Sequence, residues 1–480
     1  MSGDLGSVGG RRAARDVVIQ VIGRVFNLLL GIVVTVLIVR LLGDEGYGSW
    51  ATSFAIMGIG GYFADFGFEQ VAVKRAAEEP ERESEWLGAL LTLRLALALP
   101  VTLVCLAALL LVANGAQMRE AGLLICLTPL LTSGNVLRTA FQLRVRNDVP
   151  TALVTVNSLL WTAAVLVIWF ADAGIVTLAA AFVAIGTLTA GLEALLALRV
   201  AKISLRGATA LWGDLARIGL SVGIAGLLTL AYARLDQVLV FELAGAHAAG
   251  EYGAAYRILD SAQFLPIAVM TTMFPIISAA YPQNMGRVKT VVDAAFEYLA
   301  IASLPTLAVA LAVGEPLTKL LFGAEFTDAA VPLQIFMATF VLICIGYLVG
   351  NLVLVLDLQR RFIRYAGIAL VFNVGVNLVV IPEYGFVGAA WVTFATEVLI
   401  LALASRMVIR KLGFGPPVSR PLRAAAAAAV MGGGVWGLYE VGLPLGLTLA
   451  AGAVVYPLLL LAFRALIPAQ LRLLMQSREV

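Results

Sequence analysis

The chain has 480 residues, of which 61% are hydrophobic and only 13% charged, whereas soluble globular proteins contain about 45–50% apolar and about 25% charged residues. This composition excludes a water-soluble globular protein. The net charge of +3 at pH 7 gives no sign of a nucleic-acid-binding surface. The continuous apolar runs exclude a β-barrel, because barrel strands alternate in segments of about 10 residues.

Apolar segments long enough to cross a bilayer as helices, about 20 residues each, recur along the whole chain. We predict fourteen of them, and therefore an all-α polytopic membrane protein. Because this number is even, both termini are expected on the same side. The predicted helices cover residues 17–42, 48–69, 86–113, 121–140, 150–171, 175–199, 217–243, 252–280, 290–314, 329–356, 363–382, 386–405, 424–441 and 444–467.

Lys and Arg residues indicate the orientation, because cytoplasmic loops of membrane proteins carry an excess of them. With the N-terminus inside, most of the 33 Lys and Arg residues fall in cytoplasmic segments, and only Arg40, Arg119 and Lys319 fall outside. We therefore predict a multi-pass protein of the cytoplasmic (inner) membrane with both termini cytoplasmic. No predicted loop is long enough for an extramembrane catalytic or ligand-binding domain.

A polar turn after the first predicted helix recurs in the middle of the chain. The segment "RLLGDEGYGSWATSF" at 40–54 has a counterpart in "ELAGAHAAGEYGAAYRI" at 242–258, where a helix end, a short polar turn and a Gly-rich motif with a Tyr follow in the same order. Two further pairs of segments match at a similar separation, 141–157 with 357–373 and 170–188 with 381–399.

Three matches in one order predict two repeated halves of six helices, residues 1–205 and 206–412, followed by an extra helix pair and a short cytoplasmic tail at 413–480. Since six is even, both halves begin in the cytoplasm, and the repeats are parallel. Transporters that rock two lobes around a central cavity include proteins built from parallel repeats. This organisation argues against a simple membrane anchor.

The first predicted helix carries a polar stripe. Gln20, Arg24, Asn27, Gly31 and Thr35 are three or four positions apart, which places them on one helix face. A charged group near the bilayer centre costs about 2.5–3.5 kcal/mol on insertion scales and normally faces a cavity or a partner. We therefore predict that Gln20, Arg24 and Asn27 line a cavity. The alternative is that Arg24 extends to the inner membrane interface.

The seventh and eighth predicted helices carry Arg234 with Asp236 and Arg257 with Asp260. Guanidinium groups bind phosphate and pyrophosphate through bidentate hydrogen bonds, so Arg234 and Arg257 are candidates to join Arg24 in a cationic cavity. Alternatively, these four charged residues pair with one another as interhelical structure. An exporter of organic cations would instead need buried carboxylates and aromatic faces.

The chain offers no pattern for a disulfide framework or a metal centre. Cys105, Cys126 and Cys344 all fall inside apolar segments, and His247 is the single histidine. We predict neither a metal site nor a cofactor.

Three motifs resemble a known family. A first helix ending "RLLGDEGYG", a seventh helix with "RLDQVLVFELAG" followed by "GEYGAAYRI", and "EYGFVGAAW" before the twelfth helix are similar to the polysaccharide-biosynthesis (Wzx-type) lipid-linked oligosaccharide flippases. These flippases share the MOP superfamily with the lipid II flippase and the multidrug and toxin extrusion (MATE) transporters. Residue by residue, Gly43, Gly46, Tyr47 and Gly48 fit the first motif, and Asp236 and residues 250–253 fit the second.

The resemblance implies a V-shaped, two-lobed bundle that moves a polyprenyl-pyrophosphate-linked sugar by alternating access. It also implies coupling to Na⁺, H⁺ or the membrane potential, for which Asp236 and Asp260 are the candidate residues. The fourteen-helix count resembles the lipid II flippase branch, in which the added helix pair helps form a groove for the lipid tail.

We therefore predict a non-enzymatic flippase that translocates a polyprenyl-pyrophosphate-linked oligosaccharide across the cytoplasmic membrane for surface polysaccharide biosynthesis. Its expected partners are this substrate, membrane lipids and the polysaccharide polymerase or glycosyltransferase machinery, with no nucleic acid. A MATE-type ion-coupled antiporter of drugs or other small molecules and a lipid II flippase remain alternatives. A membrane enzyme would generally need a large outer loop with catalytic carboxylates or histidines, which the chain lacks.

Overall fold

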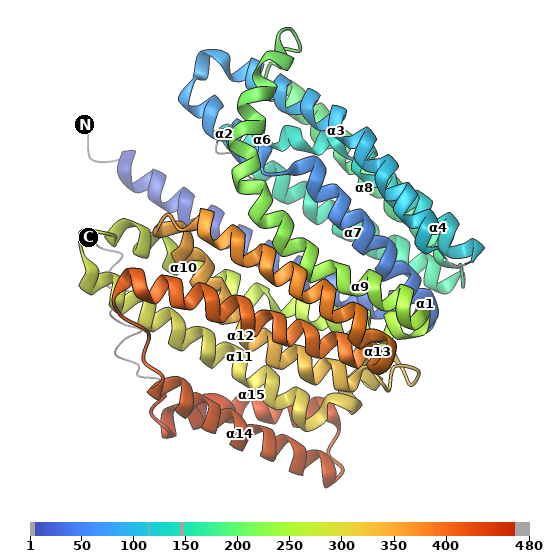
Figure 1. Cartoon of the computed structure of the whole chain (residues 1–480), viewed down its shortest axis with the longest axis vertical. Coiled ribbons are helices and arrows are strands. Elements are labelled where there is room, and N and C mark those ends of the chain that lie inside the picture. The colour runs from blue at the N-terminus through green and yellow to red at the C-terminus, as the bar shows by residue number, and fades with distance from the viewer. Residues whose placement is uncertain (1–4, 114, 145–147, 466–480) are drawn as a thin grey trace. The chain divides into compact units, whose positions relative to one another are not determined.

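The computed structural model describes residues 5–113, 115–144 and 148–465, with side chains from Phe26 onward except at 28, 29, 221, 222 and 225. Within these residues every regular element is a helix (Figure 1). The predicted all-helical class is therefore confirmed. The chain divides into two compact units, Met1–Gly250 and Glu251–Val480. The predicted lobes at 1–205 and 206–412, with the extra pair at 413–480, stay predictions.

The first unit contains long helices joined by short helical turns. Its elements are α1 (Leu5–Asp65), α2 (Phe68–Glu78), η1 (Pro80–Arg82), α3 (Glu83–Val112), α4 (Ala116–Cys126), α5 (Thr128–Leu131), η2 (Ser133–Arg138), α6 (Thr139–Leu143), α7 (Asp148–Phe170), α8 (Ile175–Val200) and η3 (Ala208–Leu211). Helix α9 (Trp212–Ala262) begins in this unit and continues into the second.

The second unit continues the same architecture. After the end of α9 it contains α10 (Phe264–Ala280), α11 (Met285–Phe322), α12 (Ala330–Val355), α13 (Gln359–Leu412), α14 (Ser419–Glu440) and α15 (Leu445–Ala462). Helices α11, α12 and α13 pack against one another in chain order, and α14 packs on α11.

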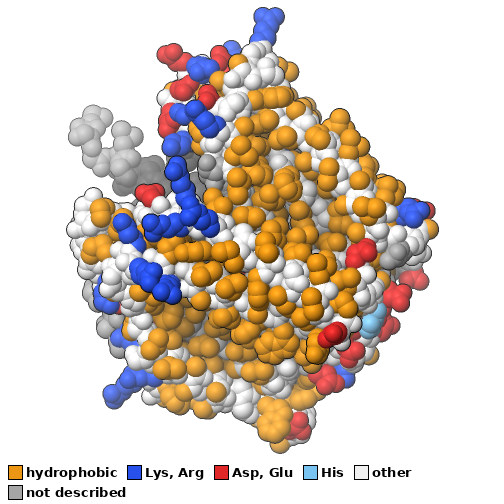
Figure 2. Space-filling view, viewed as in Figure 1, with side chains coloured by type: hydrophobic (Ala, Val, Ile, Leu, Met, Phe, Trp, Pro, Cys, Tyr) orange, Lys and Arg blue, Asp and Glu red, His pale blue; other side chains and the backbone are white. Residues whose placement is uncertain are grey.

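Large apolar side chains cover the outside of both units. Leu111 is 86% exposed, Phe170 84% and Val371 74%, and hydrophobic side chains occupy most of the face in Figure 2. A membrane-spanning segment must satisfy its backbone hydrogen bonds internally, which a helix does within one segment. Helices with apolar outer faces are therefore the form that this sequence adopts, and the protein is a multi-pass membrane protein.

Glycines divide the longest helices at the places where the sequence predicts loops. Gly43 in α1, Gly245 in α9 and Gly385 in α13 have φ values of 65°, 92° and 58°. An L-residue with a side chain rarely adopts a positive φ, whereas glycine does so at no steric cost. Each glycine lies between two predicted spans, so α1, α9 with α10, and α13 each contain the two helices expected there.

The fourth predicted span, 121–140, is the least regular. The chain runs there through α4, α5, η2 and α6 rather than through one helix. Pro129 lies in the first turn of α5, and a proline cannot donate a backbone hydrogen bond to a preceding helical turn. Hydropathy identified this segment but not its broken geometry.

Nine stretches within the described residues are long and apolar enough to cross a membrane. Two of them, Gly226–Ala280 and Gln359–Leu412, each contain a glycine break between two predicted spans. The Ala- and Gly-rich helix α14, predicted as a span at 424–441, is not among the nine. The total of fourteen stays a prediction.

The terminal helix pair is held to α11 by packing and by polar contacts. Met431 and Tyr456 belong to a buried cluster that includes Val313 of α11. The Tyr456 hydroxyl donates to the Ile301 carbonyl oxygen at 2.8 Å. The Arg420 guanidinium contacts the Glu297 carboxylate at 2.7 Å, so α14 and α15 are integral to the second unit.

Candidate functional site

The polar stripe of α1 is only partly described. The side chains of Gln20 and Arg24 lie outside the described residues. The Asn27 amide donates to the Thr155 hydroxyl of α7 at 3.2 Å, and the Thr35 hydroxyl donates to the Gly31 carbonyl oxygen in its own helix. The described part of the stripe therefore contacts α7 and the helix backbone. The assignment of all three residues to a substrate cavity stays a prediction.

The four charged residues of α9 divide between the two units. Arg234, half-buried, and Asp236, fully buried, belong to the first unit, whereas exposed Arg257 and half-buried Asp260 belong to the second. Each of the four has an interaction partner. Their predicted roles in pyrophosphate binding and ion coupling stay predictions.

A polar chain in the second unit extends from Asp260. The Gln263 amide donates to the Asp260 carboxylate at 3.3 Å. The Tyr347 hydroxyl of α12 donates to the side-chain amide oxygen Oε1 of Gln263 at 3.1 Å. Gln263 therefore uses both ends of its amide, and this links α9 to α12 through Asp260. Neither Gln263 nor Tyr347 was predicted as a site residue, because the pairing depends on how α12 packs.

The two Gly-rich turns of the sequence repeat meet in the first unit. A methyl group on Gly48 would lie 2.0 Å from the Ala246 carbonyl oxygen, and one on Gly250 would lie 2.0 Å from the Asp44 carbonyl oxygen. His247 Nδ1 contacts Asp44 Oδ2. The glycines permit a backbone approach that no other residue allows, so this junction is tightly packed.

An ion pair with a buried carboxylate stabilises the first unit. Arg138 binds Glu69 in a bidentate geometry, with Nε to Oε1 at 2.8 Å and Nη2 to Oε2 at 2.6 Å. The Gln142 amide adds a hydrogen bond to Glu69 Oε1 at 3.1 Å. Nearby, Arg94 Nη1 lies 3.6 Å from Asp65 Oδ1. A buried carboxylate requires such partners, and here α2 obtains them from η2 and α6.

A buried amide and hydroxyl network joins the two parts of α13. Asn377 donates to Asn373 at 3.3 Å, and Asn373 donates to the Thr396 hydroxyl at 3.3 Å. The Tyr252 and Thr393 hydroxyls lie 3.2 Å apart. Polar side chains of this kind hydrogen-bond across membrane helices, so this network is a packing element.

Metal binding finds no support in the described part of the chain, which contains no group of three or more His, Cys, Asp or Glu side chains placed to hold an ion. The three cysteines are buried and free.

Comparison with known proteins identifies the family. The model of a family described as "Polysaccharide biosynthesis protein" matches residues 13–280, more than half of the chain. The chain belongs to this family. The match includes both Gly-rich turns and the Arg234 and Asp236 region, and it confirms the resemblance seen in the sequence motifs.

Two curated relatives come from Haloferax volcanii. The probable flippase AglR is 26% identical over 242 residues, which are 48% of this chain and 51% of that protein. The probable low-salt glycan biosynthesis flippase Agl15 is 26% identical over 145 residues, which are 30% of this chain and 31% of that protein. The chain thus spans about half the length of the first relative (51%) and about a third of the second (31%).

Solved structures share the fold over most of the chain. The lipid II flippase MurJ, in an inward closed conformation, aligns with a TM-score of 0.77 at 13% identity, covering 93% of this chain and 99% of that one. An inward-facing multidrug resistance MATE transporter of the MOP superfamily aligns with a TM-score of 0.69 at 16% identity, covering 81% and 94%. At these identities the likeness establishes a MurJ- and MATE-like fold.

Proposed function

We propose that the protein is a flippase that moves a polyprenyl-pyrophosphate-linked oligosaccharide across the cytoplasmic membrane for surface polysaccharide biosynthesis. One observation carries the proposal: a chain of the polysaccharide biosynthesis family has the fold of a lipid flippase along nearly its whole length. The curated relatives are themselves named as probable flippases, one of them of glycan biosynthesis.

In the proposed mechanism the sugar–pyrophosphate head group enters a central cavity from the cytoplasm. Arg24, Arg234 and Arg257 hold the pyrophosphate, because guanidinium groups form charge-assisted bidentate hydrogen bonds with phosphate oxygens. The two lobes then rock and release the head group outside, while the prenyl tail stays in the lipid. Asp236 or Asp260 couples this cycle to Na⁺ or H⁺. The cycle requires no bond chemistry, so the protein acts without catalysis or a cofactor.

The described surroundings of Asp260 favour its role as the coupling residue of the second unit. Asp260 is half-buried and accepts a hydrogen bond from Gln263, which Tyr347 holds in place. A half-buried carboxylate oriented in this way is held in position. Protonation or Na⁺ binding at Asp260 would change its interaction with Gln263, and thereby the contact between α9 and α12.

A proteoliposome assay tests the proposal. Purified protein is reconstituted with a fluorescent polyprenyl-pyrophosphate-linked oligosaccharide, and the fraction accessible to a membrane-impermeant quencher is followed over time. Wild type is expected to move the substrate, Arg24→Ala to abolish its movement, and Arg24→Lys to restore part of the rate. Arg119→Ala is a matched control, because Arg119 is exposed and lies on the predicted outer side. Normal flipping by an Arg24→Ala, Arg257→Ala double variant would contradict the cationic-cavity mechanism.

A MATE-type antiporter is the second candidate function, because the MATE fold covers 81% of the chain. The same liposomes distinguish the two functions. An antiporter would exchange a fluorescent organic cation for Na⁺ or H⁺ and leave the lipid-linked sugar in place, whereas the proposed flippase shows the reverse pattern.

A further inference from the structure

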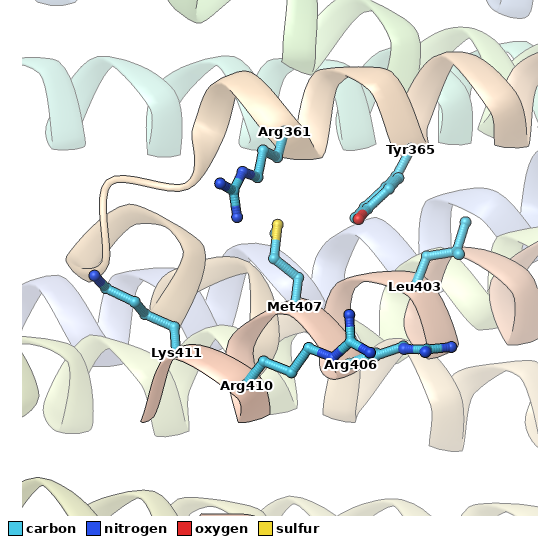
Figure 3. Close-up of a pocket in the computed structure, with 7 residues that line it drawn as sticks. All are labelled: Arg361, Tyr365, Leu403, Arg406, Met407, Arg410 and Lys411. Atoms are coloured by element: carbon cyan, nitrogen blue, oxygen red, sulfur yellow. The ribbon is translucent and has the colours of Figure 1, made fainter. Parts of the chain in front are cut away.

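A pocket of about 420 Å³ lies between the two halves of α13, away from every predicted site residue. Arg361 and Tyr365 line it from the half before Gly385, and the residues from the half after the glycine are Leu403, Arg406, Met407, Arg410 and Lys411. Figure 3 shows Arg361 and Tyr365 extending toward the second half, with Met407 facing them.

Helical spacing explains why these side chains converge. Arg361 and Tyr365 are four residues apart, and Leu403, Met407 and Lys411 follow one another at the same interval, so each set shares a helix face. The chain reverses at Gly385, which brings the two faces together. Met407 is buried, whereas Arg361, Arg406, Arg410 and Lys411 are exposed. The pocket therefore combines an apolar inner part with a cationic rim.

The rim contains four cations, Arg361, Arg406, Arg410 and Lys411. Among residues 26–465 whose side chains are described, no carboxylate forms an ion pair with Arg361, Arg406, Arg410 or Lys411. Three other cations of the second unit do have one: Lys289 with Asp293, Lys319 with Glu315, and Arg420 with Glu297. Uncompensated charges of one sign around a concavity focus the electrostatic potential and attract an anion.

The cations of this pocket are placed differently from those at the matching helix end of the first half of the chain. In the ungapped match of 170–188 with 381–399, Gly174 aligns with Gly385, and each glycine precedes a helix. Continuing that alignment pairs Arg410 with Arg199, but Arg406 with Leu195 and Lys411 with Val200. In the first half the next cations, Lys202 and Arg206, follow the end of α8, whereas Arg406 and Lys411 lie within the last turns of α13.

We propose that this pocket binds a lipid head group through its phosphate or pyrophosphate. Basic pockets between membrane helices at the cytoplasmic surface are known to hold anionic lipid head groups, and arginines bind phosphate oxygens in a bidentate manner. The apolar side chains of Leu403 and Met407 suit the beginning of the attached chain. The proposal does not depend on which substrate the protein moves, because the pocket contains none of the predicted cavity residues.

Two kinds of molecule carry such a head group, an anionic bilayer lipid and a polyprenyl-pyrophosphate carrier. The test uses the purified full chain in neutral detergent and measures binding by microscale thermophoresis. The probes are dioctanoyl phosphatidylglycerol, farnesyl pyrophosphate, inorganic pyrophosphate and, as a neutral lipid, dioctanoyl phosphatidylcholine. We expect at least one of the two anionic lipid probes to bind about tenfold more tightly than phosphatidylcholine, and its binding to weaken with added salt.

The variants are R406Q/R410Q and, as a matched control, R360Q/R364Q, which removes the same charge from exposed residues of α13 outside the pocket. The first pair is expected to weaken lipid binding about tenfold and the control less than about twofold, since only the first pair contacts the phosphate. R361Q removes a pocket cation from the opposite half and is expected to weaken binding as well, which guards against a folding defect in R406Q/R410Q.

The outcomes separate the sources. Tighter binding of phosphatidylglycerol identifies a bilayer lipid, and tighter binding of farnesyl pyrophosphate identifies the carrier; either result supports the site. The proposal is overturned if R406Q/R410Q and R361Q both bind like wild type, if neither lipid probe exceeds phosphatidylcholine, or if inorganic pyrophosphate binds as tightly as both lipid probes.

Discussion

One cluster of cationic side chains in each unit illustrates two different arrangements. In the first unit Arg138 is engaged by Glu69 in a bidentate pair that Gln142 completes. In the second unit Arg406 and Arg410 line an open pocket together with two further cations. A guanidinium held by a buried carboxylate stabilises the fold, whereas one left without an acid in a concave site is available for an anionic ligand.

The presence or absence of a carboxylate partner thus distinguishes arginines that stabilise the fold from arginines that can bind a ligand. Helix-end arginines look alike in a hydropathy plot, and their partners alone distinguish them. Removal of a structural arginine should therefore reduce stability, and removal of a pocket arginine should reduce ligand binding alone.

Breaking the ion pair of the first unit should have the largest effect. The Glu69 side chain is 7% exposed and that of Arg138 43%, so Arg138→Ala leaves a buried carboxylate without its partner. We expect it to cost about 3–5 kcal/mol of stability, visible as a lowered thermal unfolding midpoint in detergent. Glu69→Ala should cost less, because Arg138 can reach water. Equal losses in the two variants would contradict this asymmetry.

The glycine junction of the first unit should give the next largest effect. Gly48→Ala places a methyl group against the Ala246 carbonyl oxygen, and overpacking of this kind typically costs about 1–3 kcal/mol. Gly433→Ala in α14 is the matched control, because nothing lies within 4 Å of an added methyl group there. The control should be neutral or slightly stabilising. A Gly48→Ala protein that melts like wild type would show that the close approach is not maintained.

Arg420 allows paired and unpaired cations to be compared within the second unit, since it has an acidic partner, Glu297. Arg420→Ala removes the 2.7 Å contact with Glu297, and a hydrogen bond between charged groups contributes about 1.5–3 kcal/mol. We expect faster amide hydrogen exchange in α14 than in wild type. Unchanged exchange would mean that the apolar cluster around Met431 holds the helix without the ion pair.

The smallest stability effect is expected at the pocket. Arg410→Gln removes an exposed cation that has no carboxylate partner among the described residues, and surface substitutions of this kind stay within about 0.5 kcal/mol. The thermal unfolding midpoint should match that of wild type. A loss comparable to that of Arg138→Ala would place Arg410 among the structural charges.

Much of the fold could be predicted from the sequence. Long apolar runs locate the helices, and Gly43, Gly245 and Gly385 mark the breaks because a positive φ favours glycine. The irregular path near Pro129 was missed, because hydropathy averages over a window and ignores the missing amide donor of proline.

The polar partnerships were harder to predict. Glu69 and Arg138 are far apart in the sequence, and their pairing depends on how α2 packs against η2 and α6. The sequence does not indicate the α13 pocket, because its cations lie near a helix end on the predicted cytoplasmic side, where an excess of Lys and Arg is expected. The sequence does indicate intramembrane charges such as Arg24, because a charged side chain in a bilayer is energetically unfavourable. This unfavourable free energy does not identify the residue with which the charge pairs.

The central claim is that a cationic cavity moves a pyrophosphate-linked glycan. It is tested most directly by the rate at which reconstituted protein translocates a fluorescent polyprenyl-pyrophosphate-linked oligosaccharide, compared between wild type and the Arg24→Ala, Arg257→Ala double variant at equal protein density. We predict translocation by wild type and none above protein-free liposomes by the double variant. Equal rates in the two proteins would contradict the account.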